Sequence, residues 1–391
     1  MARGSQLLAL CVLAASCAAL PAWAQSRYQQ QVSVTMGVDH DTNPGLRAEN
    51  ARSASRLRLN PRYTLLRQGD VDTLSLSLGA TIEKSSDEAV SRNRQDPNAR
   101  VQWQHAWVNT VLGLNAGYAR SSLREALLED TGQLTSDGTR TVKNLGATLS
   151  HQLSPLYRTS GGLQAQWTRD TGTSGNPDSR QNSANAELSR SLDATSEVYV
   201  AGQWTSFEPD RVEWELIPGF ILLGPSNRSI MRSMDVGYRN QIDEVWHWNV
   251  SAGMSKYTGP ISDRAFKGQV QLGYSGQRWN VTGAWSRQPV TDSLRGTFSQ
   301  SQQLRLNADY AWDELTRIGM NTYYTRTMST QRNTTRGVGM SLSRELSPLW
   351  RATLQLSHRQ VNRKNEGLAW SSNEASGSSA YVYLTYTHPD F

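Results

Sequence analysis

The stretch TLSLSLGATIE, from Thr73 to Glu83, alternates apolar residues with small or polar ones at every step. Successive side chains of a β-strand point to opposite faces, so a period of two indicates a strand with one apolar and one polar face. A soluble β-sandwich alternates in the same way, so this pattern establishes a strand but leaves its surroundings open.

The same period recurs along the whole chain, and no window after Ala24 has a helical period. We count about 18 strands of roughly 10–14 residues, with about 16 as the alternative count, and tilted strands need about 9–11 residues to cross a bilayer. Pro61 lies inside the second strand and would remove a donor from the ladder, so we expect a β-bulge there. Further runs begin at Val32, Leu112, Val198, Trp246, Phe266 and Leu304.

The lengths of the connections distinguish a membrane-spanning barrel from a soluble β-sandwich, because short and long connections alternate along the chain. The short ones fall near Arg67–Val71, Trp107–Val111, Leu153–Leu156, Leu192–Glu197, Ile242–Val245, Gly276–Trp279, Asp313–Leu315 and Leu346–Leu349. The long ones fall near Asp39–Arg52, Ser85–Asp96, Ser121–Thr139, Arg169–Arg180, Phe207–Asn227, Tyr257–Arg264, Arg287–Gln300, Met328–Thr334 and Asn362–Ser378. We therefore predict an all-β transmembrane antiparallel β-barrel with short periplasmic turns and long extracellular loops.

One turn sequence occurs twice, as LSPLYR from Leu153 to Arg158 and as LSPLWR from Leu346 to Arg351. Proline presets a turn conformation, serine can cap it, and the aromatic residue would begin the returning strand at the membrane interface. The segment from Arg190 to Val200 is a looser third copy. Equivalent turns of a barrel built from repeated hairpins explain this repetition.

The N-terminal segment Met1–Ala24 has the features of a secretory signal peptide, with cleavage predicted after Ala22-Trp23-Ala24. Both cysteines, Cys11 and Cys17, lie inside it, and lipoprotein processing at Cys17 is the alternative. The predicted mature chain, residues 25–391, then has no cysteine and must fold without disulfides. A hydrophobic content of 37% and a mean hydropathy of −0.58 are low for a large soluble core, although 13 Trp and 14 Tyr argue against disorder.

Tryptophan and tyrosine gather near both ends of the predicted strands, which is typical of the two aromatic girdles of a membrane barrel. The last strand would end at Phe391, as in the assembly signal of bacterial outer-membrane barrels, but Pro389 and Asp390 interrupt the usual alternation. We therefore predict location in the cell outer membrane, in contact with its lipid and lipopolysaccharide, after insertion by the barrel assembly machinery.

Arginines recur on the polar face of the predicted strands, where Glu187, Asp235 and Asp309 also lie. The formal net charge is +6, and an arginine-lined lumen would concentrate anionic solutes. The alternative is that these arginines are solvated or paired with neighbouring acids in the wall. The predicted lumen-lining residues are Arg58, Arg62, Arg158, Arg239, Arg305, Arg317, Arg351 and Arg359.

The loop from Glu208 to Gly224, EPDRVEWELIPGFILLG, is the longest strongly apolar stretch outside the strands. It is predicted either to constrict the lumen or to bind on the outer surface, with a functionless loop as the third alternative. The residues concerned are Trp214, Leu216, Ile217, Phe220 and Ile221.

The sequence carries no nucleophile elbow, metalloprotease motif or phosphate-binding loop, and its six histidines are scattered. We therefore expect no enzyme activity, no cofactor and no metal site. Arginine is spread evenly without a basic run, so nucleic-acid binding is not indicated.

The chain resembles the outer-membrane β-barrels found beside exopolysaccharide export systems of Gram-negative bacteria. The resemblance rests on QVSVTMGVDHDTNPGLRA (Gln31–Ala48), SRNRQDPNARVQWQ (Ser91–Gln104) and the two LSPL turns. It implies a passive porin-like exit for a secreted exopolysaccharide, which the arginines would favour if acidic, together with a polysaccharide export complex as partner. The alternatives are a general anion-preferring porin and a plugged structural or surface-binding barrel.

Overall fold

The structure is a computed structural model. It describes residues 27–124, 126, 138–172, 178–210, 213–217, 220–223, 228–259, 262–292, 297–328, 331–365 and 372–388. The predicted signal peptide and the terminal residue Phe391 lie outside these ranges. Within them, no helix is long and apolar enough to cross a membrane.

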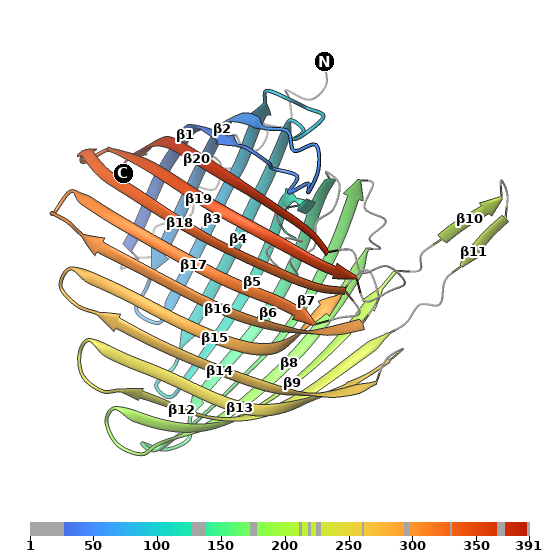
Figure 1. Cartoon of the computed structure of the whole chain (residues 1–391). Helices are drawn as coiled ribbons and strands as arrows, with labels where there is room; N and C mark the ends of the chain where they lie inside the picture. The colour runs from blue at the N-terminus through green and yellow to red at the C-terminus, as the bar shows by residue number, and fades with distance from the viewer. Residues whose placement is uncertain are drawn as a thin grey trace.

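Eighteen strands form one antiparallel sheet, and the first and last strands pair from Val32↔His388 to Asp41↔Ser379, which closes it into a barrel (Figure 1). The predicted fold class and the strand count of 18 are therefore confirmed. The barrel strands are β1 (Arg27–Asp41), β2 (Ala54–Gln68), β3 (Asp72–Ser85), β4 (Arg94–Ala106), β5 (Thr110–Ser122), β6 (Gly138–Gln152), β7 (Tyr157–Gly172), β8 (Ser179–Ser191), β9 (Ser196–Pro209), β12 (Ser229–Gln241), β13 (Trp246–Thr258), β14 (Asp263–Ser275), β15 (Trp279–Asp292), β16 (Thr297–Ala311), β17 (Thr316–Met328), β18 (Gln331–Ser347), β19 (Trp350–Asn365) and β20 (Ser372–His388). The remaining strands, β10 (Glu213–Ile217) and β11 (Phe220–Leu223), pair only with each other.

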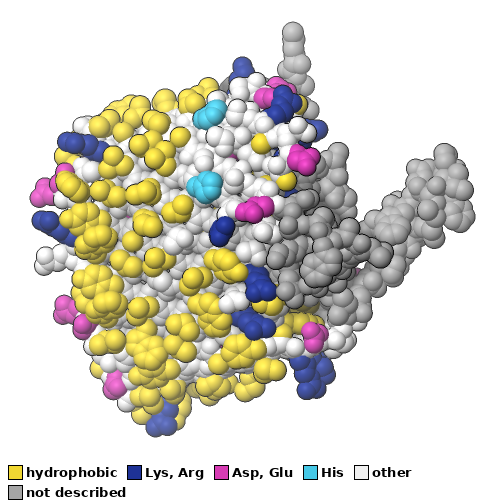
Figure 2. Space-filling view, in the orientation of Figure 1, with side chains coloured by type: hydrophobic (Ala, Val, Ile, Leu, Met, Phe, Trp, Pro, Cys, Tyr) yellow, Lys and Arg dark blue, Asp and Glu magenta, His cyan; other side chains and the backbone are white. Residues whose placement is uncertain are grey.

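Most apolar side chains of the strands face outward, where large residues such as Leu163, Met234 and Val382 are more than half exposed. They form a broad hydrophobic field on the face shown in Figure 2. A barrel with an apolar outer surface buries that surface in the acyl chains of a membrane, and its closure leaves no strand edge unpaired in lipid. This explains why a chain with so little apolar content folds without a conventional core.

Aromatic residues pair directly across neighbouring strands near the short turns. The ring centroids are 4.8 Å apart in Trp246–Tyr274, 4.5 Å in Trp279–Tyr310 and 5.1 Å in Trp350–Tyr386. Such rings prefer the membrane–water interface, where an apolar body meets a polar tip. They form a girdle at this end of the barrel, which we call the turn end; the opposite end is the loop end.

The repeated turns share one hydrogen-bonding pattern. The Ser154 hydroxyl accepts from the N–H groups of Leu156 and Tyr157 at 3.3 and 3.2 Å, and Ser347 does the same for Leu349 and Trp350. The predicted capping role of serine is therefore confirmed. The carboxylates of Asp193, Asp243 and Asp313 accept from the second and third residues after them in three further turns. The sequence repeat thus extends to five turns, with aspartate in place of serine in three.

Three connections at the loop end are shorter than expected. The strand bounds leave only residues 259–262, 293–296 and 329–330 between their strands, where longer loops were predicted. The strands continue past the end of the apolar alternation, because the polar residues there still pair across the ladder. The predicted bounds of the loops Tyr257–Arg264, Arg287–Gln300 and Met328–Thr334 are therefore too wide.

The β-bulge expected at Pro61 is absent. Arg58↔Glu83, Leu59↔Ile82 and Arg62↔Gly79 keep one register on both sides of the proline, and only the pairs between them are missing from the β2–β3 ladder. Proline removes a donor without adding a residue, so the ladder is interrupted while the strands stay aligned.

Candidate functional site in the barrel lumen

The end of the β15–β16 hairpin leaves the barrel wall. The β14–β15 ladder stops at Gly268↔Arg287, and the β16–β17 ladder stops at Gln300↔Met328, whereas β15 and β16 stay paired to Asp292↔Thr297. Pro289 contributes to the separation because it has no N–H to offer β14. We call Gln288–Asp292 and Thr297–Ser299 the inner hairpin tip.

The inner hairpin tip packs against the inward face of the opposite wall. Phe298 joins a buried cluster with Phe207 of β9, Met231 of β12 and Tyr257 of β13, with ring centroids 6.4 Å from Phe207 and 5.9 Å from Tyr257. These three partners point into the barrel, whereas Phe298 lies in phase with the outward-facing Leu304 of its own strand. The contact requires the tip to fold inward.

Gln300 holds the base of the inner hairpin tip against β13 and β14. The Tyr257 hydroxyl donates to its Oε1 at 3.0 Å, and its Nε2 donates to the carbonyl of Phe266 at 3.1 Å. Phe266 belongs to the part of β14 that β15 no longer pairs with, so the side chain of Gln300 replaces part of the lost ladder.

A groove of about 420 Å³ lies between the inner hairpin tip and the wall formed by β6–β9. Amide, hydroxyl and guanidinium groups dominate its lining, an arrangement that can bind a polar or anionic solute through several hydrogen bonds. Arg140 is already paired with Asp170 at 2.8 Å, whereas Arg305 has no hydrogen bond or ion pair with any described residue. The lining includes Arg140, Gln166, Thr168, Gln181, Gln203, Thr205, Gln288, Thr291, Gln303 and Arg305.

The apolar loop predicted either to constrict the lumen or to bind on the outer surface contributes β10 and β11, whose hairpin projects away from the barrel in Figure 1. The side chains of Trp214, Leu216, Ile217, Phe220 and Ile221 lie outside the described part of the structure. Among the described residues, the inner hairpin tip folds into the lumen, and it lies within the predicted long loop Arg287–Gln300. Polar Gln300 and Gln302 at outward positions were the available signal, because a lipid-facing wall would carry apolar residues there.

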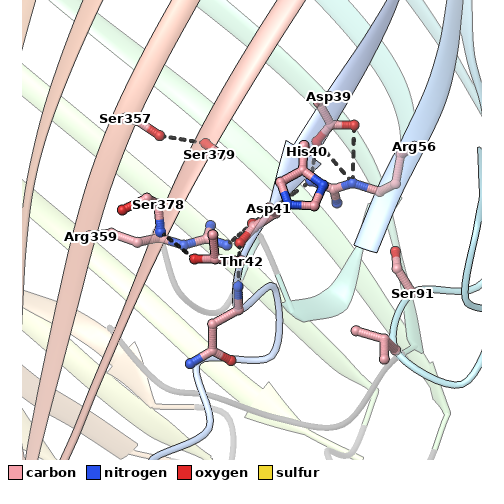
Figure 3. Close-up of polar contacts among 12 residues, drawn as sticks. Asp39, His40, Asp41, Thr42, Arg56, Ser91, Ser357, Arg359, Ser378 and Ser379 are labelled. Atoms are coloured by element: carbon pink, nitrogen blue, oxygen red, sulfur yellow. Dashed lines mark hydrogen bonds and ion pairs between the residues drawn. The ribbon is translucent and has the colours of Figure 1, made fainter. Parts of the chain in front are cut away.

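A network of ion pairs covers the lumen wall at the loop end, from β19 through β1 to β5. Arg56 contacts Asp39 at 2.5 Å, and Arg359 contacts Asp41 at 2.5 Å from the other side of β1 (Figure 3). The side chain of Glu83 is fully buried, and its carboxylate lies 2.9 Å from the guanidinium of Arg58.

The carboxylate of Glu83 also lies 3.1 Å from the guanidinium of Arg94, which lies 3.4 Å from the carboxylate of Asp96. Arg120 of β5 extends the network to Asp96 at 3.7 Å. Buried carboxylates require such partners, so these groups hold the wall together. The sequence signal for these acids is their position, because Asp39, Asp41, Glu83 and Asp96 all alternate in the lumen-facing phase.

A smaller group of paired charges lies at the turn end. Arg239 contacts Glu187 at 2.7 Å and Glu197 at 2.9 Å, and its guanidinium carbon lies 3.9 Å from the centre of the Tyr199 ring. Arg158 reaches the same Glu197 at 3.1 Å. Both arginines are therefore neutralised by the wall itself.

The eight predicted arginines all lie in the lumen-facing phase of their strands, but they do not form one site. Arg58, Arg158, Arg239, Arg351 and Arg359 each pair with an acid. Arg62, Arg305 and Arg317 are exposed and have no partner among the described residues. Of these three, only Arg305 lines the groove beside the inner hairpin tip. Within the described ranges, no group of His, Cys, Asp and Glu could hold a metal ion.

No family model matches the sequence, and no curated protein matches it. The copper transporter OprC is similar in structure at 8% identity and a TM-score of 0.50, covering 93% of this chain and 81% of that one. The ferric enterobactin receptor PfeA of Pseudomonas aeruginosa, in a mutant form, reaches 0.49 at 9% identity, with 93% and 81% covered. OccAB4 of Acinetobacter baumannii reaches 0.49 at 9% identity, with 94% and 99% covered.

These likenesses are likenesses of fold. The closed 18-strand barrel with its apolar outer surface, a fold that it shares with OprC, places the protein in the outer membrane.

Proposed function

We propose that the protein is a porin-like outer-membrane channel through which a secreted, acidic exopolysaccharide leaves the cell passively. The groove between the inner hairpin tip and the β6–β9 wall is the observation that carries this proposal, because it pairs amide groups with the unpartnered cation of Arg305. Amides exchange hydrogen bonds with sugar hydroxyls, and a free guanidinium attracts a uronate or another acidic substituent.

The weak charge excess of the lumen suits passage rather than tight binding. Most lumen arginines are neutralised by the wall, so an acidic chain meets few free cations along its path. Conduction requires binding that is strong enough for entry and weak enough for release. Arg62, Arg305 and Arg317 lie on β2, β16 and β17, and their separation supports such successive weak contacts.

A polysaccharide export complex in the periplasm is the proposed partner, since a passive channel needs a source of polymer at its inner mouth. Lipid, lipopolysaccharide and the barrel assembly machinery complete the proposed surroundings. The sequence resemblance to exopolysaccharide-associated barrels supports the choice of polymer, and the lumen chemistry supports its acidity.

Planar bilayer recordings on the refolded mature protein test this proposal. We expect steady conductance with a preference for anions, and block by an oligosaccharide of a uronic acid at concentrations where a neutral oligosaccharide of equal length has no effect. Anion-selective conductance that neither sugar blocks would favour the general anion-preferring porin. Absence of conductance would favour the plugged or surface-binding barrel.

A further inference from the structure

Three cations occupy directly opposing positions on three adjacent strands of the outer wall. Arg232 of β12 pairs in register with Lys256 of β13, which pairs in register with Arg264 of β14. All three are exposed and lie in the outward-facing phase. Neighbouring strands are about 4.8 Å apart, and like charges directly opposite one another destabilise a sheet. We call this set the cation row.

No described residue neutralises the cation row, since none of its three side chains has a hydrogen bond or ion pair. The next outward positions toward the loop end are Ile230 and Thr258, which are in register with each other and carry no charge. Elsewhere on the outer surface, residues of opposite charge occupy paired positions on neighbouring strands, as in Arg180↔Glu208. The row is therefore an uncompensated concentration of positive charge.

The cation row borders directly on the membrane band. One outward position further toward the middle of each strand lie Met234, Met254 and Phe266, which are in register and are 62%, 55% and 43% exposed. Two residues along a strand span about 6.6 Å, so the charges lie just above an apolar row. Figure 2 shows Lys and Arg side chains at the loop-end margin of the apolar field on the face in view.

We propose that the cation row is a binding site for the phosphorylated headgroup of a glycolipid in the outer leaflet, with the acyl chains lying over Met234, Met254 and Phe266. A phosphate is an acceptor for several charge-assisted hydrogen bonds, and three cations within reach of one another match a headgroup that carries two phosphates. The adjoining apolar row selects a lipid-borne phosphate over a free one. This inference depends on the barrel and its outer surface and is independent of what passes through the lumen.

Lipid binding to the refolded mature protein in detergent tests the proposal, with diphosphorylated lipid A as the probe. The row variant carries Arg232→Ser, Lys256→Ser and Arg264→Ser. The control variant carries Lys143→Ser, Arg180→Ser and Arg336→Ser, which removes the same charge from three exposed outward positions that are not neighbours of one another. Each basic side chain beside an anionic lipid contributes about a factor of five, so we expect roughly a hundredfold weaker binding in the row variant. The control variant should stay within about threefold of the wild type.

Two further measurements distinguish the source of the phosphate. Dephosphorylated lipid A should bind the wild type as weakly as lipid A binds the row variant, and inorganic phosphate should not displace the lipid. Equal affinity of the row and control variants, no effect of dephosphorylation, or displacement by inorganic phosphate would each overturn the proposal. If the row variant fails to fold, Lys256→Glu alone replaces it and is expected to lower the affinity at least as much as Lys256→Ser.

Discussion

The lumen has two walls of opposite character. From β19 through β1 to β5, arginines and acids neutralise one another, and acids such as Asp41 and Glu83 are almost fully buried. Around the inner hairpin tip, amides line a groove and Arg305 has no acidic partner among the described residues. Arginines in the same phase of equivalent strands therefore serve two purposes. The paired ones build the wall, and the unpaired ones are left to meet the solute.

The largest effect is expected at Glu83, the carboxylate shared by Arg58 and Arg94. Glu83→Ala removes the buried carboxylate that these two guanidinium groups share, which costs about 3–5 kcal/mol of unfolding free energy. Thermal unfolding, followed by the gel-mobility difference between folded and unfolded barrel, measures this loss. The control is Glu345→Ala, which breaks the exposed pair with Arg351 and should cost about 0–1 kcal/mol. Equal losses would mean that burial does not distinguish the two ion pairs.

The next effect is expected at Phe298, whose ring docks the inner hairpin tip on Phe207 and Tyr257. Phe298→Ala removes a buried side chain, a change that costs about 3 kcal/mol or more in a packed core. Because the tip pairs with neither β14 nor β17, this cost falls on its docking and leaves the rest of the barrel intact. Single-channel recordings should show larger and noisier conductance, while the unfolding temperature changes little. Unchanged conductance would show that the tip does not limit the lumen.

Charge reversal at Arg305 is expected to act on solute affinity without altering the fold. A unit charge about 4 Å away is worth about 1 kcal/mol in water, so Arg305→Glu should weaken block by an acidic oligosaccharide more than about tenfold. Titration of the block in planar bilayers provides the measurement. Thermal stability is the control and should stay at the wild-type value, because no described residue depends on Arg305. A loss of stability without a change in block would assign Arg305 to the wall.

The smallest effect is expected at the turn end, at Asp193 in the β8–β9 turn. Hydrogen bonds from the Ser196 hydroxyl and the Thr195 N–H lower the pKa of Asp193 from 3.8 to about 2. A carboxylate with a lowered pKa stabilises the folded state above its unfolded pKa, and that contribution is lost as pH falls toward about 2. Asp193→Asn should therefore reduce the change in unfolding temperature between pH 5 and pH 2. An identical pH profile in the variant would contradict this role of the turn.

Strand count, closure and the recurring turns could be predicted because each follows from local patterns. Alternation identifies strands, and turn residues such as Ser154 and Ser347 act on the backbone beside them. The inward hairpin could not be predicted in this way. Phe298 has the phase of a lipid-facing residue, and only its partners on β9 and β13 show that it lies inside.

The pairing of the arginines was equally hidden from the sequence. Arg359 and Asp41 meet across the closure of the barrel, between residues far apart in the chain. Alternation places a side chain on the lumen face. It does not say which acid lies opposite, because that depends on the register between strands that are far apart in the sequence. The sequence pattern therefore predicts which arginines face the lumen. It does not predict which of them pair with an acid and which have no acidic partner among the described residues.

The most direct test compares two exposed lumen arginines, one free and one paired, in the same recording. Arg305→Gln and Arg158→Gln each remove one positive charge, but Arg158 is already neutralised by Glu197 at 3.1 Å. The account predicts that Arg305→Gln weakens block by an acidic oligosaccharide about fivefold and that Arg158→Gln changes it less than about twofold. Equal weakening by the two variants would contradict it, because the lumen would then act through its overall charge and not through the unpaired arginine beside the inner hairpin tip.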